Sequence, residues 1–94
     1  MTYVVNTAWK HSNSIDWDWM QKGLDEALRK ADPNCSVQWF EIDEMTHGSV
    51  ATFPSKEVFE SMRARRESHR KEANDEGIKM IYEVVGHVKA EGSS

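Results

Sequence analysis

The chain has 94 residues and a formal net charge of −4, a length that fits one domain and excludes a second hydrophobic core. Acidic and basic residues alternate along it, without the basic stripe of a nucleic-acid-binding protein, so nucleic acid is excluded as an expected partner. Cys35 is the only cysteine, which excludes an intrachain disulfide and is typical of a reducing compartment.

Residues 3–9 are β-branched and aromatic, and they predict a first strand with alternating faces. A helix follows, because apolar residues then recur at three- and four-residue steps, as in an amphipathic helix with one buried stripe. The stripe consists of Trp17, Met20, Leu24, Ala27, Leu28 and Ala31. Ser14 or Asp16 can cap the start of this helix, and Pro33 ends it.

Two strands that form a hairpin are predicted in the middle of the chain, over residues 36–42 and 49–53. Pro54 closes the second of them, since proline cannot extend a central strand. Ser55 can then accept a hydrogen bond from the first turn of a helix predicted over residues 56–74.

Gly77 stands where a left-handed residue commonly ends a helix, and residues 78–88 predict the last strand. The order strand, helix, strand, strand, helix, strand indicates an α+β domain of βαββαβ type. We expect a four-stranded antiparallel sheet with both helices on one face.

The predicted strands carry apolar side chains on both faces, more than two short helices can cover. They are Trp39, Phe40, Ile42, Met80, Ile81, Tyr82 and Val85. A second copy packed sheet to sheet would cover the open face with one isologous contact, so we expect a homodimer. The alternative is that single apolar residues lie on the surface, which is common.

We predict one domain over residues 1–89 and a disordered tail at 90–94, which is small and polar. The first residues contain no basic segment followed by a long apolar run. We therefore expect no signal peptide, no membrane partner and a cytoplasmic location.

The chain resembles the dimeric α+β barrel superfamily, a ferredoxin-like group that includes antibiotic-biosynthesis-monooxygenase domains and uncharacterised bacterial families. The resemblance lies in the element order and in three short stretches: residues 53–57, residues 68–70 and residues 79–82. It implies a dimeric barrel with a pocket between sheet and helices. Members range from cofactor-free oxygenation of aromatic polyketides to haem degradation, so the fold does not specify a reaction.

His69 is the first candidate for chemistry, because it continues an apolar stripe of the second helix and an imidazole can act as acid, base or metal ligand. The alternative is a half-buried histidine bonded to a carbonyl or to a nearby glutamate. Haem-degrading members carry an asparagine on the first strand and a tryptophan and a histidine on the second helix. Asn6 and His69 match two of these positions, whereas Phe59 replaces the tryptophan, which argues against haem.

Four tryptophans in so short a chain can line a cleft for a flat aromatic ligand, although core packing would also explain them. The expected ligand-binding residues are Trp9, Trp39, Phe59, Met62, Arg66 and Tyr82. Binding of a small apolar or aromatic ligand is the favoured function. The alternatives are a cofactor-independent, monooxygenase-like enzyme that uses Asn6 and His69, and a structural or protein-interaction module.

No metal or cofactor is expected. His11, His47 and His87 fall in a predicted loop, a predicted turn and the last strand, and no two of them have metal-ligand spacing. Cys35 has no neighbouring base in the sequence, and there is no glycine-rich phosphate loop.

Overall fold

A computed structural model describes residues 2–94 and has seven elements of secondary structure. They are β1 (Tyr3–His11), α1 (Trp17–Arg29), β2 (Ser36–Asp43), β3 (Thr46–Phe53), α2 (Lys56–Ser61), α3 (Arg63–Asp75) and β4 (Ile78–His87). The α+β class is confirmed. The order of elements departs from strict βαββαβ, because the helix predicted over residues 56–74 is broken in two.

The break lies at Met62, whose backbone (φ −100°, ψ 11°) leaves the helical region. Its N–H closes α2 on the carbonyl of Phe59, and α3 starts at the next residue without a side-chain cap. The apolar stripe that was counted along one continuous helix therefore does not keep a single direction across Met62.

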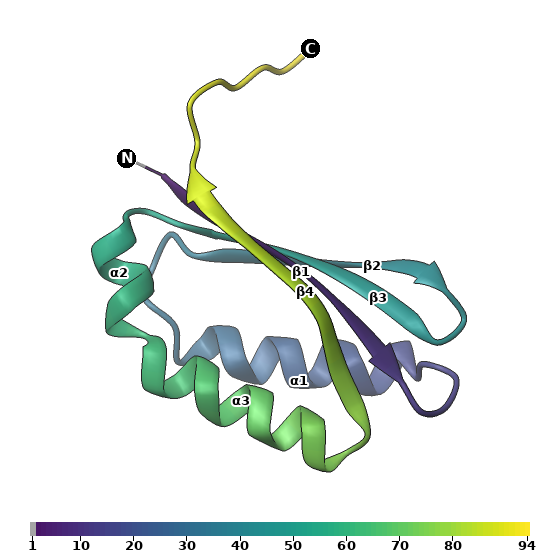
Figure 1. Ribbon diagram of the computed structural model, residues 1–94. Helices are drawn as coiled ribbons and strands as arrows, with labels where there is room; N and C mark the ends of the chain where they lie inside the picture. Colours follow the sequence, from purple (N-terminus) through teal and green to yellow (C-terminus); the bar gives the residue numbers. More distant parts are fainter. Residues whose placement is uncertain (1) are drawn as a thin grey trace.

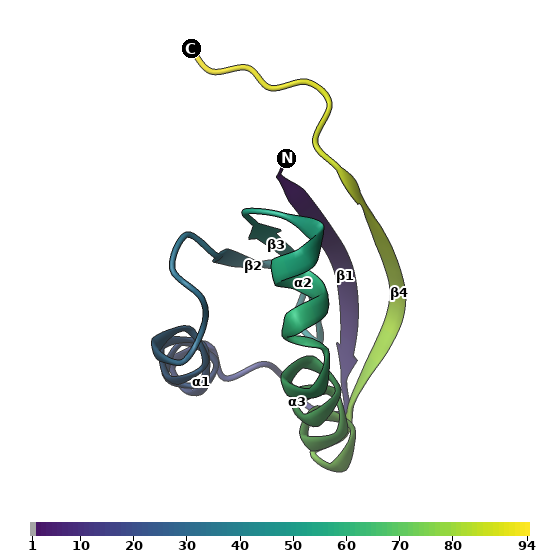
Figure 2. The same ribbon diagram turned by 90° about the vertical axis from the view of Figure 1, so that its left-hand side faces the viewer.

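The four strands form one antiparallel sheet in the order β2-β3-β1-β4. All three helices lie on one side of this sheet, and no element within residues 2–94 covers the other side (Figures 1 and 2). Because the side chains of a strand alternate between faces, each strand presents one row to the helices and one row to the open face.

The strands β1 and β3 are longer than predicted. In β1 the pairing continues to His11, which lies opposite Ile78. In β3 it begins at Thr46, and the hairpin turn is correspondingly tight, with the Asp43 carboxylate accepting a hydrogen bond from Met45 N at 2.9 Å. Polar residues at these ends led to the shorter prediction, because a polar strand end is hard to distinguish from a loop.

The core lies between the sheet and α2. Its buried members are Tyr3, Val5, Phe53 and Phe59. The ring of Phe59 is 4.9 Å from that of Tyr3 and 5.3 Å from that of Phe53, centroid to centroid. Aromatic pairs at this separation add to the stabilisation that burial itself supplies. This small core fixes the position of α2.

The predicted end signals of the helices are confirmed at three places. Asp16 caps α1 by accepting a hydrogen bond from Trp19 N at 3.1 Å. Ser55 caps α2 through Val58 N at 3.2 Å. Gly77 follows α3 with φ +83°, a left-handed conformation that glycine adopts without a steric penalty.

Helix α1 is packed more loosely than its apolar stripe predicts. Only Met20 of this helix is buried, whereas Leu24 and Leu28 are half-buried. Figure 2 shows α1 standing apart from the edge strand β2. A helix with an amphipathic face of this kind normally buries that face, whereas α1 leaves part of its apolar face uncovered.

The open face of the sheet carries large apolar side chains. Phe40, Ile42, Tyr82 and Val84 have 44%, 50%, 44% and 62% of their surface exposed. The Phe40 ring lies over Gly48 on the neighbouring strand, in the space that a Cβ atom there would need. Among residues 2–94, no helix is long and apolar enough to span a membrane.

Candidate functional site

Two histidines form a buried hydrogen-bonded pair on the helix-covered face of the sheet. His11 Nε2 lies 2.7 Å from His47 Nδ1, and the two residues are only 8% and 4% exposed. His11 is the last residue of β1, and His47 is the second residue of β3. The sequence prediction that these histidines occupy a loop and a turn is wrong, because both strands extend through them.

Three tryptophans surround the His47 ring. Trp9 stacks on it at 6.4 Å between centroids, Trp39 is tilted at 5.4 Å, and Trp17 meets it edge to face at 6.3 Å. They come from β1, β2 and α1, so His47 is the point where three elements meet. Pairing in the sheet explains two of these contacts, since Trp9 lies directly opposite His47 and Trp39 opposite the residue Ser49.

Polar atoms of this cluster are bonded as well. Trp9 Nε1 donates to Thr7 Oγ1 at 2.8 Å, and Trp17 Nε1 donates to Glu41 Oε2 at 3.3 Å. Buried indoles usually find such acceptors. These bonds hold two of the rings in fixed orientations around His47.

The surroundings keep both imidazoles neutral near pH 7. Burial, together with the charge of the neighbouring His11, lowers the pKa of His47 to about 4. Burial also lowers the pKa of His11. Of two neutral rings in one hydrogen bond, one donates and the other accepts. The outer nitrogens, His11 Nδ1 and His47 Nε2, then offer one donor and one acceptor, and transfer of protons along the pair exchanges these roles.

A groove runs between α1 and the edge strand β2, beside this cluster. Its volume is about 550 Å³, within the range of roughly 300–1,000 Å³ that is usual for small-molecule sites. Its lining residues are mostly apolar or amide-bearing, with a single carboxylate; Gln38 and Phe40 line it from the edge strand, although alternation places their side chains on the open face. The lining residues are Trp17, Gln21, Leu24, Asp25, Leu28, Val37, Gln38, Trp39 and Phe40.

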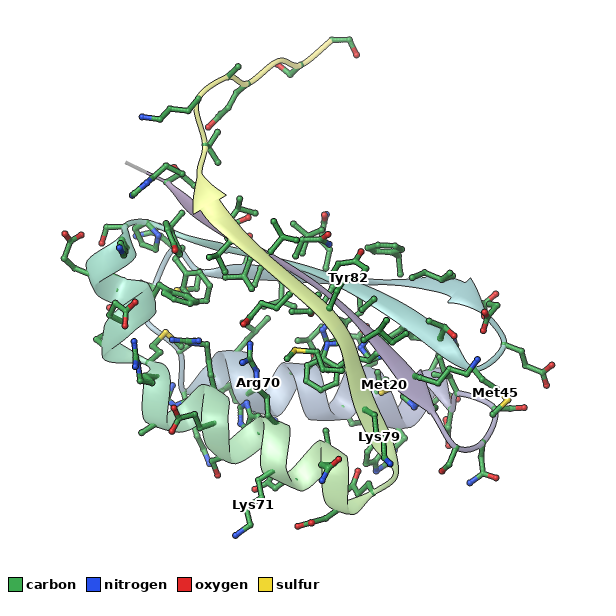
Figure 3. The ribbon with its side chains drawn as sticks, viewed as in Figure 1. Met20, Met45, Arg70, Lys71, Lys79 and Tyr82 are labelled. Carbon is green, nitrogen blue, oxygen red and sulfur yellow. The ribbon has the colours of Figure 1, made fainter. Side chains whose placement is uncertain are left out.

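A second, smaller hollow of about 150 Å³ lies on the other side of the histidine pair. It is formed by the polar connection between β1 and α1, residues 12–16, together with His11, Met20 and Ile78. Figure 3 shows Met20 between α1 and the sheet. His11 lines this hollow, whereas two of the tryptophans that contact His47 line the groove.

The two predicted catalytic residues are not brought together. Asn6 alternates with the buried residues Val5 and Thr7 and therefore belongs to the open face. There its amide donates to Ser49 O at 3.0 Å and accepts from Tyr82 Oη at 3.2 Å. His69 is exposed on α3, on the helix side of the sheet, so the sheet separates the two side chains.

The stripe that was expected to carry His69 toward the sheet faces it only in its first part. Phe59 is buried and Met62 half-buried, and the Arg66 guanidinium lies 3.6 Å above the Phe59 ring. Burial lowers the pKa of Arg66. Beyond Arg66 it is Arg70 that reaches the sheet, through an ion pair with Glu83, and Figure 3 shows Lys71 pointing the opposite way.

The six predicted ligand-binding residues thus divide among three places. Trp9 and Trp39 belong to the histidine cluster, and Trp39 also lines the groove. Phe59, Met62 and Arg66 belong to the core beside α2, and Tyr82 lies on the open face. The apolar residues on the helix-facing side of the groove that the prediction missed include Trp17, Leu24, Leu28 and Val37. The first three belong to the apolar stripe of α1, which was their signal in the sequence.

Within residues 2–94, no group of three or more histidine, cysteine or carboxylate side chains is placed to hold a metal ion. Cys35, the residue before β2, is half-buried, and burial raises the pKa of its thiol. A raised pKa reduces the fraction of thiolate, the nucleophilic form. Neither feature adds to the chemistry of the histidine cluster.

The chain is compatible with a ferredoxin-like arrangement at the level of its α+β sheet and helices. No family model matches it, and no curated protein or solved structure matches it either.

Proposed function

We propose that this protein binds a small, flat aromatic ligand in the groove between α1 and β2. The observation that carries the proposal is a groove of about 550 Å³ with a half-covered apolar surface on each side. One is the Leu24 and Leu28 side of α1, and the other is the Val37 and Trp39 side of β2. A planar ligand would complete the burial of both.

The chemistry of the walls favours an aromatic ligand over an aliphatic one. Trp17 and Trp39 both line the groove, and ring-on-ring contacts contribute about 0.5–1.5 kcal/mol beyond the burial of area. Gln21 supplies an amide group in the lining, and polar groups of this kind orient a ligand in an apolar site. The packing of Trp17 and Trp39 against His47 holds their rings in place before a ligand arrives, and this lowers the entropic cost of binding.

The test uses quinoline as a neutral planar probe and the four indole N–H signals as reporters in two-dimensional NMR. We expect saturable shifts at Trp17 and Trp39, and no shift at Trp19, which points away from the groove side of α1. Leu24→Asp should weaken binding at least tenfold, because it places a charge against the ring. The matched control, Gly23→Asp, lies on the same helix in open space and outside the lining, and it should leave the affinity unchanged. Absence of shifts at Trp17 and Trp39 would refute the proposal.

We also propose that two copies pack sheet to sheet through the open face, as in a ferredoxin-like dimeric α+β barrel. The support is the apolar row Phe40, Ile42, Tyr82 and Val84, each at least 44% exposed. Exposed apolar patches of this kind usually mark an interface. A two-fold contact would use the same patch on both molecules.

Sedimentation at micromolar concentration tests the dimer. The wild-type chain should sediment with twice the protomer mass, and Val84→Lys should give a folded protomer, because it places two charges in the interface. Glu26→Lys, an exposed change on α1, is the control and should leave the dimer intact. A wild-type chain that sediments as a protomer at this concentration would contradict the dimer.

A further inference from the structure

We propose that the ligand of the groove is a planar aromatic cation, such as an N-alkylated heteroaromatic ring; the inference rests on the ligand-binding function proposed above. Its basis is the charge of the side chains around the groove. Asp25 is the only charged residue in the lining. Glu41 is outside the lining, but its carboxylate accepts a hydrogen bond from Trp17, one of the aromatic walls.

The two carboxylates are held in place by uncharged donors. Gln21 Nε2 donates to Asp25 Oδ1 at 2.9 Å, and the indole of Trp17 donates to Glu41 Oε2. Neither donor neutralises the negative charge. The remaining oxygen of each carboxylate can therefore attract a cation in the groove.

The cations at the C-terminal end of α1 are paired outside the groove. Arg29 and Lys30 both pair with Glu26, at 2.9 and 3.6 Å, and Glu26 is not part of the lining. Arg65, from α3, donates to the backbone carbonyl of Lys30 at the far end of the helix. Lys22, in the middle of α1, is also outside the lining, so Asp25 is the only charge that the lining itself carries.

The aromatic walls favour the same ligand. Tryptophan is the best of the aromatic side chains at attracting a cation to its ring face, and Trp17 and Trp39 both line the groove. The histidine pair behind them is neutral near pH 7 because of its burial, so it does not repel a positive ligand. An anion would meet the Asp25 carboxylate and no cationic side chain in the lining.

Three probes of similar shape separate the effect of charge from that of shape: N-methylquinolinium, quinoline and quinoline-4-carboxylate. Each is titrated into the 94-residue chain at about pH 7.5, and the tryptophan indole signals report binding. We expect the cation to bind about tenfold more tightly than quinoline, and the carboxylate to bind more weakly than quinoline. The cation alone should lose affinity as salt is raised, because only its attraction to Asp25 and Glu41 is screened.

The variant Asp25→Asn/Glu41→Gln keeps the shape of both side chains and should bring the cation to the affinity of quinoline. Both positions are exposed, so folding should be unaffected, and the wild-type salt dependence gives an answer without any variant. Equal binding of the three probes, or tighter binding of the carboxylate, would overturn the cation proposal and leave the groove as a binding site. Failure of all three to shift Trp17 and Trp39 would overturn the binding function itself.

Discussion

The buried histidine pair should make stability depend on pH. His47 has a pKa of about 4 in the folded chain against an ordinary value of 6.5, so between these values the unfolded chain binds more protons than the folded one. Stability from this group is complete above about pH 6.5 and is lost as the pH falls toward 4. The loss is about 1.4 kcal/mol at pH 5.5 and on the order of 3 kcal/mol below pH 4.

The measurement is the free energy of unfolding by urea at several values between about pH 7.5 and 5.5. This window avoids the carboxylates whose pKa is lowered, namely Glu60 through its hydrogen bond from Arg63 and Asp43 through that from Met45 N. Both lose their contribution at lower pH, since their ordinary values are 4.5 and 3.8.

His47→Phe is the matched variant, because it keeps an aromatic ring among the three tryptophans and removes the titration. Its absolute stability can change, so the quantity compared is the slope with pH. We expect a clearly smaller slope, with a remainder from His11, whose pKa is also lowered by burial. A wild-type stability that is constant across the window, or an equal slope in His47→Phe, would refute the assignment of a neutral, buried pair.

Three further outcomes follow from packing and capping. Gly48→Ala places a methyl group where the Phe40 ring lies and should lower the free energy of unfolding by about 1–3 kcal/mol. Urea unfolding of the double variant with Phe40→Ala should show a smaller effect of the Gly48 substitution. Phe59→Ala, in the core, should cost about 3–5 kcal/mol in the same assay, and a cost below about 1 kcal/mol would mean that α2 is not packed as described. Asp16→Ala removes the cap of α1 and should cost about 1 kcal/mol, with loss of helical circular dichroism on mild heating; an unchanged transition would contradict the cap.

Local signals were reliable where the cause of a structure lies in a few neighbouring residues. Alternation along β1 correctly grouped Tyr3, Val5 and Thr7 on one face, and all three are buried. Asp16, Ser55 and Gly77 end or begin helices for reasons that act within one turn. These predictions needed no knowledge of distant contacts.

The histidine pair was missed because it depends on where two strands end. Residues 10–11 and 46–48 are polar or glycine and were interpreted as connections, yet pairing between β1 and β3 carries both strands through them. A strand end is stabilised by its partner strand, and that partner is more than thirty residues away in the chain. With His11 and His47 placed in strands of the same sheet, alternation alone would have put both on the helix face.

His69 was misplaced for the opposite reason, because a helical period was carried too far. The stripe through Phe59 and Met62 is correct within α2, but the backbone at Met62 interrupts the period. The side chain that contacts the sheet from α3 is Arg70, one position further along. No residue near Met62 is a glycine or a proline, so the sequence carries no ordinary signal for this break.

The groove illustrates a limit that holds for any amphipathic helix. The period of α1 shows which side faces the sheet, but it contains no information on the distance to the sheet. That distance is set by the bulk of the side chains at the contact, and here Trp17 and Trp39 both pack against His47 at one end of the helix. We infer that these large rings hold this end of α1 away from the sheet, so that the smaller Leu24 and Leu28 do not close on Val37 further along. On this argument, the cluster that buries the histidine pair also opens the groove that we propose for the ligand.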